Sequence, residues 1–200
     1  IDAGIKIYGG FSRNFPQKSL GLYLKPKYGY TSLDYQIFHD KPINISRLVL
    51  RNGGNDWNHS ILLDGLFSSL IAKIINVDYQ AYKPSIVYIN GNYWGLHNIR
   101  EKIDEHYIES NYGINSDDID FLENDHIIFA GDSEHYDEMM NYIDQNDISQ
   151  SEHYNYIKTQ MDINEYINYQ ICEIYFANRD WPQNNQKYWR PAVQNGKWRW

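Results

Sequence analysis

Asp180 and Asn185 are the two side chains whose types and spacing most clearly suggest chemistry. They stand five positions apart in the polar run Asn178-Arg179-Asp180-Trp181-Pro182-Gln183-Asn184-Asn185. A carboxylate in such a loop can accept the proton of an attacking hydroxyl group, and a carboxamide oxygen can bind a divalent metal ion. Both tasks belong to phosphoryl transfer. We therefore predict Asp180 and Asn185 as catalytic residues, with Asn185 also as a metal ligand.

The spacing matches the catalytic loop of protein kinases, in which an Arg-Asp pair is followed by Asn five positions after the Asp. Arg179, Asp180 and Asn185 stand at these offsets, and Asn178 takes the place of the kinase histidine. A match this short also occurs in ordinary polar connections, so a loop without chemistry is the plain alternative. The elements on either side favour the kinase interpretation.

A helix is expected before this loop and a β-hairpin after it. Asp162 followed by Glu165 is typical of a helix N-terminus, and the helix should end by Ala177 or Asn178. Apolar side chains at helical spacing predict its buried face, made of Ile163, Tyr166, Ile167, Ile171, Ile174 and Tyr175. Aromatic-rich runs at 186–191 and 197–200 flank Asn195-Gly196, a pair favoured in tight hairpin turns.

A glycine-bearing loop near the N-terminus is suited to phosphate binding. It joins two expected strands, 3–8 and 18–25. Glycine lets backbone amides approach a phosphate closely, basic side chains neutralise its charge, and a hydroxyl can donate a hydrogen bond. We predict as nucleotide-binding residues Gly9, Gly10, Ser12, Arg13 and Lys18. The alternative is a glycine turn needed only for its conformation.

Glu101 is the predicted partner of Lys18. Kinases pair the lysine that binds the nucleotide with a glutamate on a helix, and residues 100–108 read as a helix with an acidic first turn. An exposed helix start is the alternative. A second glycine-rich connection, 52–58, is interpreted as a cap of the following helix, with Arg51 and Asp56 as exceptions that could instead line the same cleft as the glycine-bearing loop. A hairpin is expected around Asn90-Gly91.

Composition and charge limit the classes of protein. A chain of 200 residues with 42% hydrophobic residues can bury a sizeable core without disulfides or metal, and its only cysteine, Cys172, is expected to be a small buried side chain. No segment is typical of a signal sequence or a membrane span, and the abrupt start at Ile1 is typical of a piece of something longer. The seven histidines lack zinc-site spacing, and no nucleophile-elbow motif occurs.

The net charge of −8 is unevenly distributed. Residues 1–100 carry 11 basic and 6 acidic side chains, whereas residues 101–200 carry 7 basic and 20 acidic ones. Polyphosphate is expected to favour the basic first half and the basic segment 174–200. Nucleic acid is not expected as a partner, because it requires a continuous basic surface.

Over essentially its whole length the chain resembles the CotH kinase-like family, named for spore coat protein H. The segments that carry the resemblance are IKIYGGFSR (5–13) with PQKSL (16–20), LVLRNGGND (48–56), NGNYWGL (90–96) with NIRE (98–101), and NRDWPQNNQKYWR (178–190) with KWRW (197–200). The resemblance implies an atypical protein kinase that uses ATP and Mg²⁺ or Mn²⁺ to phosphorylate serine of coat or surface proteins. It also implies Asp180 as the catalytic aspartate, a further acidic metal ligand shortly after Trp200, and an extracellular, cell-surface or spore-coat location.

We therefore predict an α+β, kinase-like fold. Residues 1–100 would form a β-rich nucleotide-binding lobe, and residues 101–200 a mainly helical lobe that ends in a β-hairpin and continues beyond Trp200. Activity is predicted for the complete domain rather than for residues 1–200 alone, with ATP and a serine-rich coat or surface protein as partners. The alternative is a non-catalytic surface or coat-assembly module that binds protein or glycan, since some relatives are discussed as adhesins.

Overall fold

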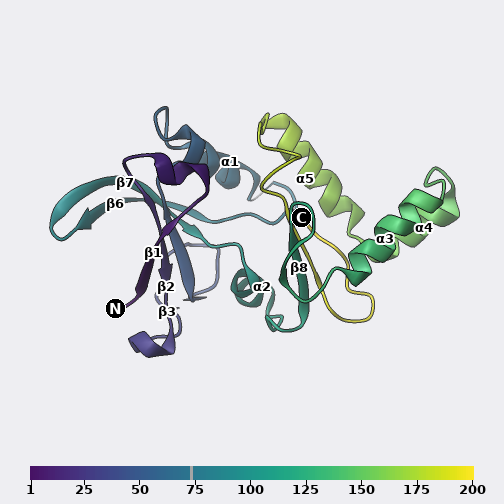
Figure 1. The fold of residues 1–200 in the computed structure, drawn as a ribbon, viewed down its shortest axis with the longest axis horizontal. Helices are drawn as coiled ribbons and strands as arrows, with labels where there is room; N and C mark the ends of the chain where they lie inside the picture. The colour runs from purple at the N-terminus through teal and green to yellow at the C-terminus, as the bar shows by residue number, and fades with distance from the viewer. Residues whose placement is uncertain (73) are drawn as a thin grey trace. The chain divides into compact units, whose positions relative to one another are not determined.

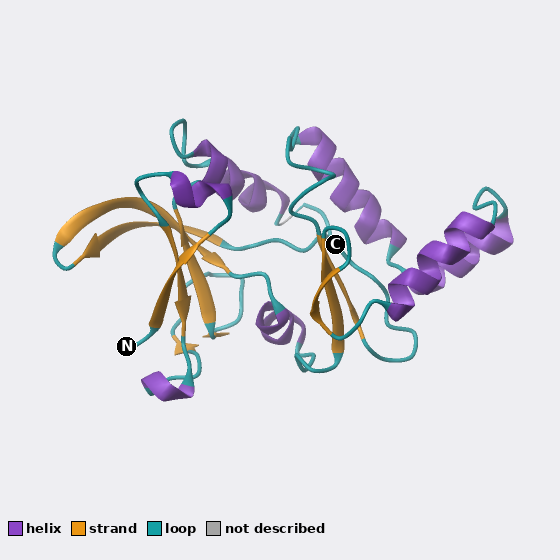
Figure 2. Ribbon diagram, in the orientation of Figure 1, coloured by secondary structure: helices purple, strands orange, loops and turns teal. Residues whose placement is uncertain are grey.

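Antiparallel sheets and short helices alternate along the chain, which confirms the predicted α+β class (Figure 2). The computed structural model describes residues 1–72 and 74–200. Unit 1 comprises residues 1–72 and Tyr79–Tyr112, and unit 2 comprises Ile74–Asp78 and Gly113–Trp200. The two units differ from the two predicted lobes in two segments: residues 74–78 belong to unit 2, and residues 101–112 belong to unit 1. The separate functional roles of the two lobes stay a prediction.

Unit 1 is built on a five-stranded antiparallel sheet with the order β1-β2-β5-β7-β6 (Figure 1). Its elements are β1 (Gly4–Tyr8), β2 (Ser19–Tyr23), β3 (Leu33–Asp34), β4 (Asn44–Ile45), β5 (Arg47–Arg51), α1 (Leu63–Ile71), β6 (Tyr82–Ile89), β7 (Asn92–Glu101) and α2 (Glu105–Tyr112), with single 3₁₀ turns at Phe11–Asn14, Pro26–Tyr28 and Gly54–Asp56. Asn90 and Gly91 have φ of 50° and 80°, so the predicted β6–β7 hairpin is confirmed. A buried cluster of Phe38, Ile45, Leu48 and Ala81 packs under the sheet.

The connection 52–58 caps the following helix, as predicted, and the residue that does so is Asp56, which was expected to be an exception. The Asp56 carboxylate accepts hydrogen bonds from the Ser60 hydroxyl at 2.6 Å and from the Leu63 amide at 3.2 Å. The second bond satisfies a donor at the start of α1 that has no partner inside the helix. The 52–58 loop is therefore a structural support.

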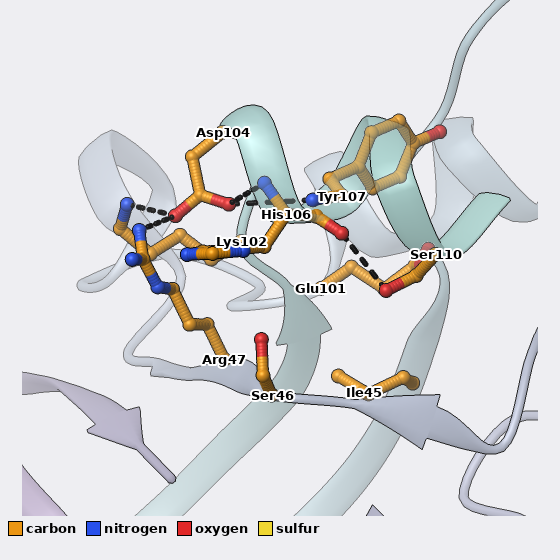
Figure 3. Close-up of a pocket in the computed structure, with 9 residues that line it drawn as sticks. All are labelled: Ile45, Ser46, Arg47, Glu101, Lys102, Asp104, His106, Tyr107 and Ser110. Carbon is orange, nitrogen blue, oxygen red and sulfur yellow. Dashed lines mark hydrogen bonds and ion pairs between the residues drawn. The ribbon is translucent and has the colours of Figure 1, made fainter. Parts of the chain in front are cut away.

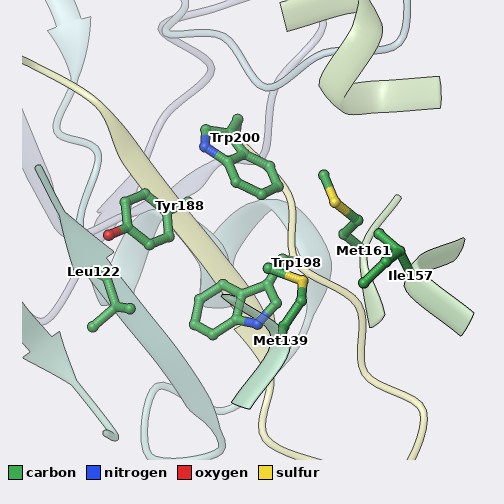
Figure 4. Packing of buried hydrophobic residues seen from close by; sticks show 7 residues of the cluster. All are labelled: Leu122, Met139, Ile157, Met161, Tyr188, Trp198 and Trp200. Carbon is green, nitrogen blue, oxygen red and sulfur yellow. The ribbon is translucent and has the colours of Figure 1, made fainter. Parts of the chain in front are cut away.

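Unit 2 combines a three-stranded sheet with three helices. Its elements are β8 (Ile119–Glu123), β9 (Ile127–Ala130), α3 (Glu134–Gln145), α4 (Ser151–Gln160), α5 (Ile163–Tyr175) and β10 (Lys187–Pro191), with sheet order β10-β8-β9. Figure 4 shows the core between them, formed by Leu122, Met139, Ile157, Met161, Tyr188, Trp198 and Trp200. Tyr188, Trp198 and Trp200 each remove a large apolar area from water in this core.

The closing segment returns along β10 after a turn at Asn195, whose φ is 66°. Trp189 and Arg199 exchange two backbone hydrogen bonds of 2.9 Å, but the longer ladder of β10 is with β8. The predicted hairpin thus consists of one paired position at the edge of a sheet.

The helix predicted at residues 100–108 begins later than expected. Arg100 and Glu101 are the last residues of β7, where they pair with Val49 and Leu48 of β5, and α2 begins only at Glu105. The acidic first turn is genuine, but sheet pairing holds the two preceding residues in extended conformation. Tertiary context here overrides a local helix signal.

The predicted N-terminus of α5 is confirmed, and its predicted buried face is confirmed in part. Asp162 Oδ1 accepts a hydrogen bond from the Glu165 amide at 3.2 Å. Ile163 and Tyr166 pack on the core as predicted, whereas Ile171, Ile174 and Tyr175 are 55%, 67% and 79% exposed. The helix has apolar side chains on more than one face, so spacing alone did not separate the buried ones from the exposed ones.

Candidate functional site

Asp180 and Asn185 lie side by side in the loop that follows α5. Asn185 Nδ2 donates to Asp180 Oδ2 at 3.3 Å, and the Asn184 amide donates to the Asp180 carbonyl oxygen at 2.8 Å. Asn185 is exposed and Asp180 partly exposed. The loop therefore presents a carboxylate and a carboxamide together at the surface of unit 2, and their catalytic role stays a prediction.

Asn178 ties this loop to the end of α5. Its Nδ2 donates to Glu173 Oε2 at 2.6 Å, and its Oδ1 accepts from the Asp180 amide at 3.1 Å. Burial raises the pKa of Glu173, and the hydrogen bond from Asn178 opposes that change. Asn178 occupies the position of the kinase histidine and acts as a bridge from helix to loop. The sequence pointed to Asn178 but not to Glu173, which lies five positions before it on α5.

Asn124 holds the other end of the loop. Its Oδ1 accepts from the Gln186 amide at 3.1 Å, its own amide donates to the Gln186 carbonyl oxygen at 2.9 Å, and its carbonyl oxygen accepts from the Tyr188 hydroxyl at 2.8 Å. Asn124 has a φ of 49°, a conformation that Asn adopts more readily than most residues. No sequence signal marked this residue, because the contact joins segments about sixty positions apart.

The glycine-bearing loop of unit 1 has a defined conformation. Gly9 has a φ of +110°, and a Cβ placed there would lie 2.3 Å from Ser12 Oγ, so only glycine fits. Ser12 is buried against Gly9, whereas Gly10 and Arg13 are exposed. Lys18 Nζ donates to the Arg13 carbonyl oxygen at 2.6 Å and closes the loop on itself. Of the predicted phosphate ligands, Gly10 and Arg13 are thus the most accessible.

Glu101 does not pair with Lys18, which corrects the predicted ion pair. Its carboxylate lies 3.3 Å from Lys41 Nζ, and both side chains are buried. Lys41 also donates to Asn111 Oδ1 at 3.0 Å, and its ammonium lies 4.0 Å from the centre of the Tyr79 ring. The aromatic contact stabilises a cation that has left water. Because Glu101 is on a strand and Lys18 is bonded to its own loop, the two predicted partners serve different parts of unit 1.

A family model described as CotH kinase protein matches residues 5–200. The chain belongs to the CotH kinase family. No curated protein was found to match it. The family assignment confirms the resemblance on which the kinase-like fold was predicted.

In this CotH kinase-family chain, metal binding by the loop that follows α5 stays a prediction. Among residues 1–72 and 74–200, no three His, Cys, Asp or Glu side chains gather in a way that could hold a metal. Asp180 and Asn185 offer oxygen ligands, and Mg²⁺ is commonly held by one or two protein groups together with phosphate oxygens and water.

In the described part of the chain, no helix combines the length and apolar character needed to cross a bilayer.

A narrow pocket in unit 1 is occupied by its own ion pairs (Figure 3). Asp104 Oδ2 accepts from Arg47 Nη1 at 2.8 Å and from Lys102 Nζ. Asp104 Oδ1 accepts from the amides of His106 and Tyr107 at 3.1 and 3.3 Å and so caps α2. The buried Asp104 carboxylate thus joins two cations and the start of α2 in unit 1.

We expect Asp104→Asn to lower the free energy of unfolding at pH 7 by about 2–4 kcal/mol, because it leaves Arg47 and Lys102 without their shared charge. Burial acts to raise the pKa of Asp104, but Lys102 and Arg47 outweigh it and hold the pKa below its ordinary value. The stabilisation is therefore present above the unfolded pKa of about 4 and is lost as pH falls through the lower folded value. Urea unfolding between pH 2 and 7 measures both effects.

The exposed Asp34 on β3 provides the control, Asp34→Asn, for the same chemical change in the same unit. This control should leave the acid dependence unchanged. If Asp104→Asn loses stability on acidification as steeply as the unmodified protein, then Asp104 is not the group responsible.

Proposed function

We propose that this chain is part of a protein kinase domain that transfers the γ-phosphate of ATP to a serine of a coat or surface protein. The observation that carries the proposal is the contact between Asp180 and Asn185 on a loop held at both ends. Phosphoryl transfer depends mainly on positioning and charge neutralisation, so fixed loop ends serve it directly. The family match supports a kinase-like role.

In unit 2, Asp180 would accept the proton of the serine hydroxyl. The serine oxygen forms a bond to the γ-phosphorus, the bond from that phosphorus to the bridging oxygen breaks, and ADP leaves with the electron pair. Asn185 would hold the Mg²⁺ or Mn²⁺ ion that neutralises charge on the phosphates. In unit 1, the exposed Gly10 and Arg13, with Gly9, Ser12 and Lys18, would bind phosphate oxygens.

ATP binding and serine phosphorylation test the proposal. The natural protein that contains these 200 residues should unfold at a higher temperature when ATP and Mg²⁺ or Mn²⁺ are added. At an ATP concentration of 100 Kd, the free energy of unfolding should rise by about 2.7 kcal/mol. It should also transfer labelled phosphate to serine of dephosphorylated casein, used as a serine-rich probe. A protein that shows neither thermal shift nor transfer with either metal would overturn the kinase proposal.

A non-catalytic surface module is the second candidate, and the β6–β7 hairpin favours it. Tyr88 and Tyr93 are each 62% exposed, and their rings lie edge to face with centres 5.8 Å apart. Exposed aromatic faces bind sugars and protein side chains. Binding to a glycan array that is lost in Tyr88→Ser, together with an absence of ATP binding, would select this candidate. The proposed location of either form is the spore coat or cell surface.

A further inference from the structure

Gln17 lies in the stem of the glycine-bearing loop, that is, in residues 15–18 just before β2. There it contacts β7 and the connection before α1. Its Nε2 donates to the Leu96 carbonyl oxygen of β7 at 2.5 Å, and its Oε1 accepts from Trp57 Nε1 at 3.3 Å. Trp57 stacks on Phe15 of the same loop, with ring centres 5.1 Å apart. One carboxamide thus connects the loop to β7 and to the connection before α1.

The backbone of the stem is held as tightly as the side chain. Asn52 Nδ2 donates to the Gln17 carbonyl oxygen at 2.6 Å, while Asn52 Oδ1 accepts from Ser19 Oγ at 2.8 Å and from the Gly54 amide at 3.0 Å. Asn52 and Ser19 are buried. Satisfied buried amide networks of this kind fix one conformation, because any alternative leaves polar groups unpaired.

His97 completes the arrangement and fixes the orientation of Gln17. Its Nε2 lies 3.0 Å from the Lys18 carbonyl oxygen, and its Nδ1 lies 3.3 Å from Gln17 Nε2. A carbonyl oxygen can only accept, so Nε2 donates to Lys18, and Nδ1 also lies 3.4 Å from the Gly95 carbonyl oxygen. The imidazole therefore contacts both Gln17 and Lys18 at the end of the loop.

Gly95 makes room for the Gln17 side chain. It has a φ of +133°, and a Cβ placed there would lie 2.6 Å from Cδ of Gln17. Any larger residue would displace the carboxamide. Gly9 thus allows the conformation of the loop itself, and Gly95 in β7 leaves room for the Gln17 side chain that contacts β7.

We propose that Gln17 is the positioning residue of the phosphate-binding loop. By joining β7, Trp57 and His97, it holds residues 9–18 in the binding conformation before the nucleotide arrives. A ligand that meets a preformed loop loses less affinity to ordering that loop. The inference rests on the proposed function, since it assigns the loop to ATP.

Gln17→Leu is the test, with trypsin cleavage after Arg13 and ATP titration as separate measurements. Cleavage of a transiently opened loop follows the population of the open form. Loss of the Gln17 hydrogen bonds should speed cleavage after Arg13 about tenfold and raise the Kd for ATP with Mg²⁺ about tenfold. The kcat at saturating ATP should stay within about twofold, because the transfer step itself is untouched.

Gln80→Leu is the matched control, since Gln80 Nε2 donates to the Glu101 carbonyl oxygen at 2.8 Å in the same unit but does not contact the loop. It should change neither the cleavage rate nor the Kd. Trp57→Phe keeps a ring against Phe15 but removes the donor to Gln17, and should shift both quantities in the same direction by a smaller factor. A cooperative thermal transition in each variant shows that the fold is retained.

The outcomes separate this inference from the proposed function. Unchanged cleavage in both Gln17→Leu and Trp57→Phe would show that Gln17 does not hold the loop. Faster cleavage with an unchanged Kd would show that the loop does not bind the nucleotide. If the unmodified protein binds no ATP, the proposed function and the nucleotide part of this inference both fail, whereas the cleavage rate still decides whether Gln17 fixes the loop.

Discussion

Asp180→Asn is expected to lower the rate of phosphoryl transfer by about 10²–10⁴-fold, while ATP binding and thermal stability stay unchanged. A carboxamide has the shape of the carboxylate but cannot take up the proton of the serine hydroxyl. The substitution leaves the loop in place, because the Asp180 amide still donates to Asn178 and an oxygen can still accept from Asn185 Nδ2. The rate at saturating ATP and the Kd for ATP, measured on the same protein, separate chemistry from binding.

Asp117→Asn is the control for this substitution, since Asp117 is an exposed aspartate in a turn of unit 2. It should transfer phosphate at the unmodified rate. Equal rates for Asp180→Asn and the unmodified protein would remove the role of Asp180 as base. If neither Asp180→Asn nor the unmodified protein transfers phosphate or binds ATP, the surface module is favoured.

Local sequence signals predicted the parts of this structure that depend on neighbouring residues. The β6–β7 hairpin follows from Asn90-Gly91, and the start of α5 follows from Asp162. In both cases a few adjacent side chains and backbone angles decide the conformation, so no knowledge of the tertiary fold is needed.

Contacts between distant segments could not be predicted in the same way. Glu101 was expected to meet Lys18, but sheet pairing of β7 with β5 places it beside Lys41 instead. Asn124 supports the loop from about sixty residues away. A single sequence shows which residues can form ion pairs or amide bonds, whereas the choice of partner is made by the packing of the whole unit.

The two candidate loops also differ in what the sequence revealed about them. The residue types at Gly9, Arg13 and Lys18 suggested phosphate binding, but only the structure shows that Ser12 is buried and that Gln17 fixes the stem. For Asp180, the sequence suggested a catalytic carboxylate, which stays a prediction, and the structure added the bridge through Asn178 to Glu173. In both loops the candidate residues could be selected from the sequence, whereas the residues that support them could not.

Glu165→Gln is expected to remove a loss of stability that the unmodified protein undergoes as pH rises. Glu165 on α5 is fully buried, its Oε2 accepts from the Trp200 amide at 2.9 Å, and its Oε1 has no hydrogen-bond partner among the described residues. Burial raises the pKa of Glu165 to about 8, Asp78 and Asp162 act in the same direction, and the Trp200 amide and Arg199 oppose them. A buried carboxyl group with one unpaired oxygen is more stable protonated than charged.

The sign of the effect follows from proton binding. Between the ordinary pKa of 4.5 and the folded value of about 8, the folded state holds a proton that the unfolded state has released. The free energy of unfolding therefore falls as pH rises through this window, by on the order of 3–5 kcal/mol, and levels off above pH 8. Glu165→Gln has no such group, so its stability should change less between pH 5 and 9.

Urea unfolding at pH 5, 7 and 9 measures this difference, with Glu152→Gln on α4 as the control because the Glu152 side chain is 79% exposed. The control should keep the pH dependence of the unmodified protein. Glu165→Gln should instead be the more stable protein at pH 9, where the unmodified chain must bury a charged carboxylate. If the free energy of unfolding depends on pH in the same way in Glu165→Gln and in the unmodified protein, then Glu165 ionises in the folded state as easily as in water. Burial beside the Trp200 amide would then not disfavour the charged carboxylate.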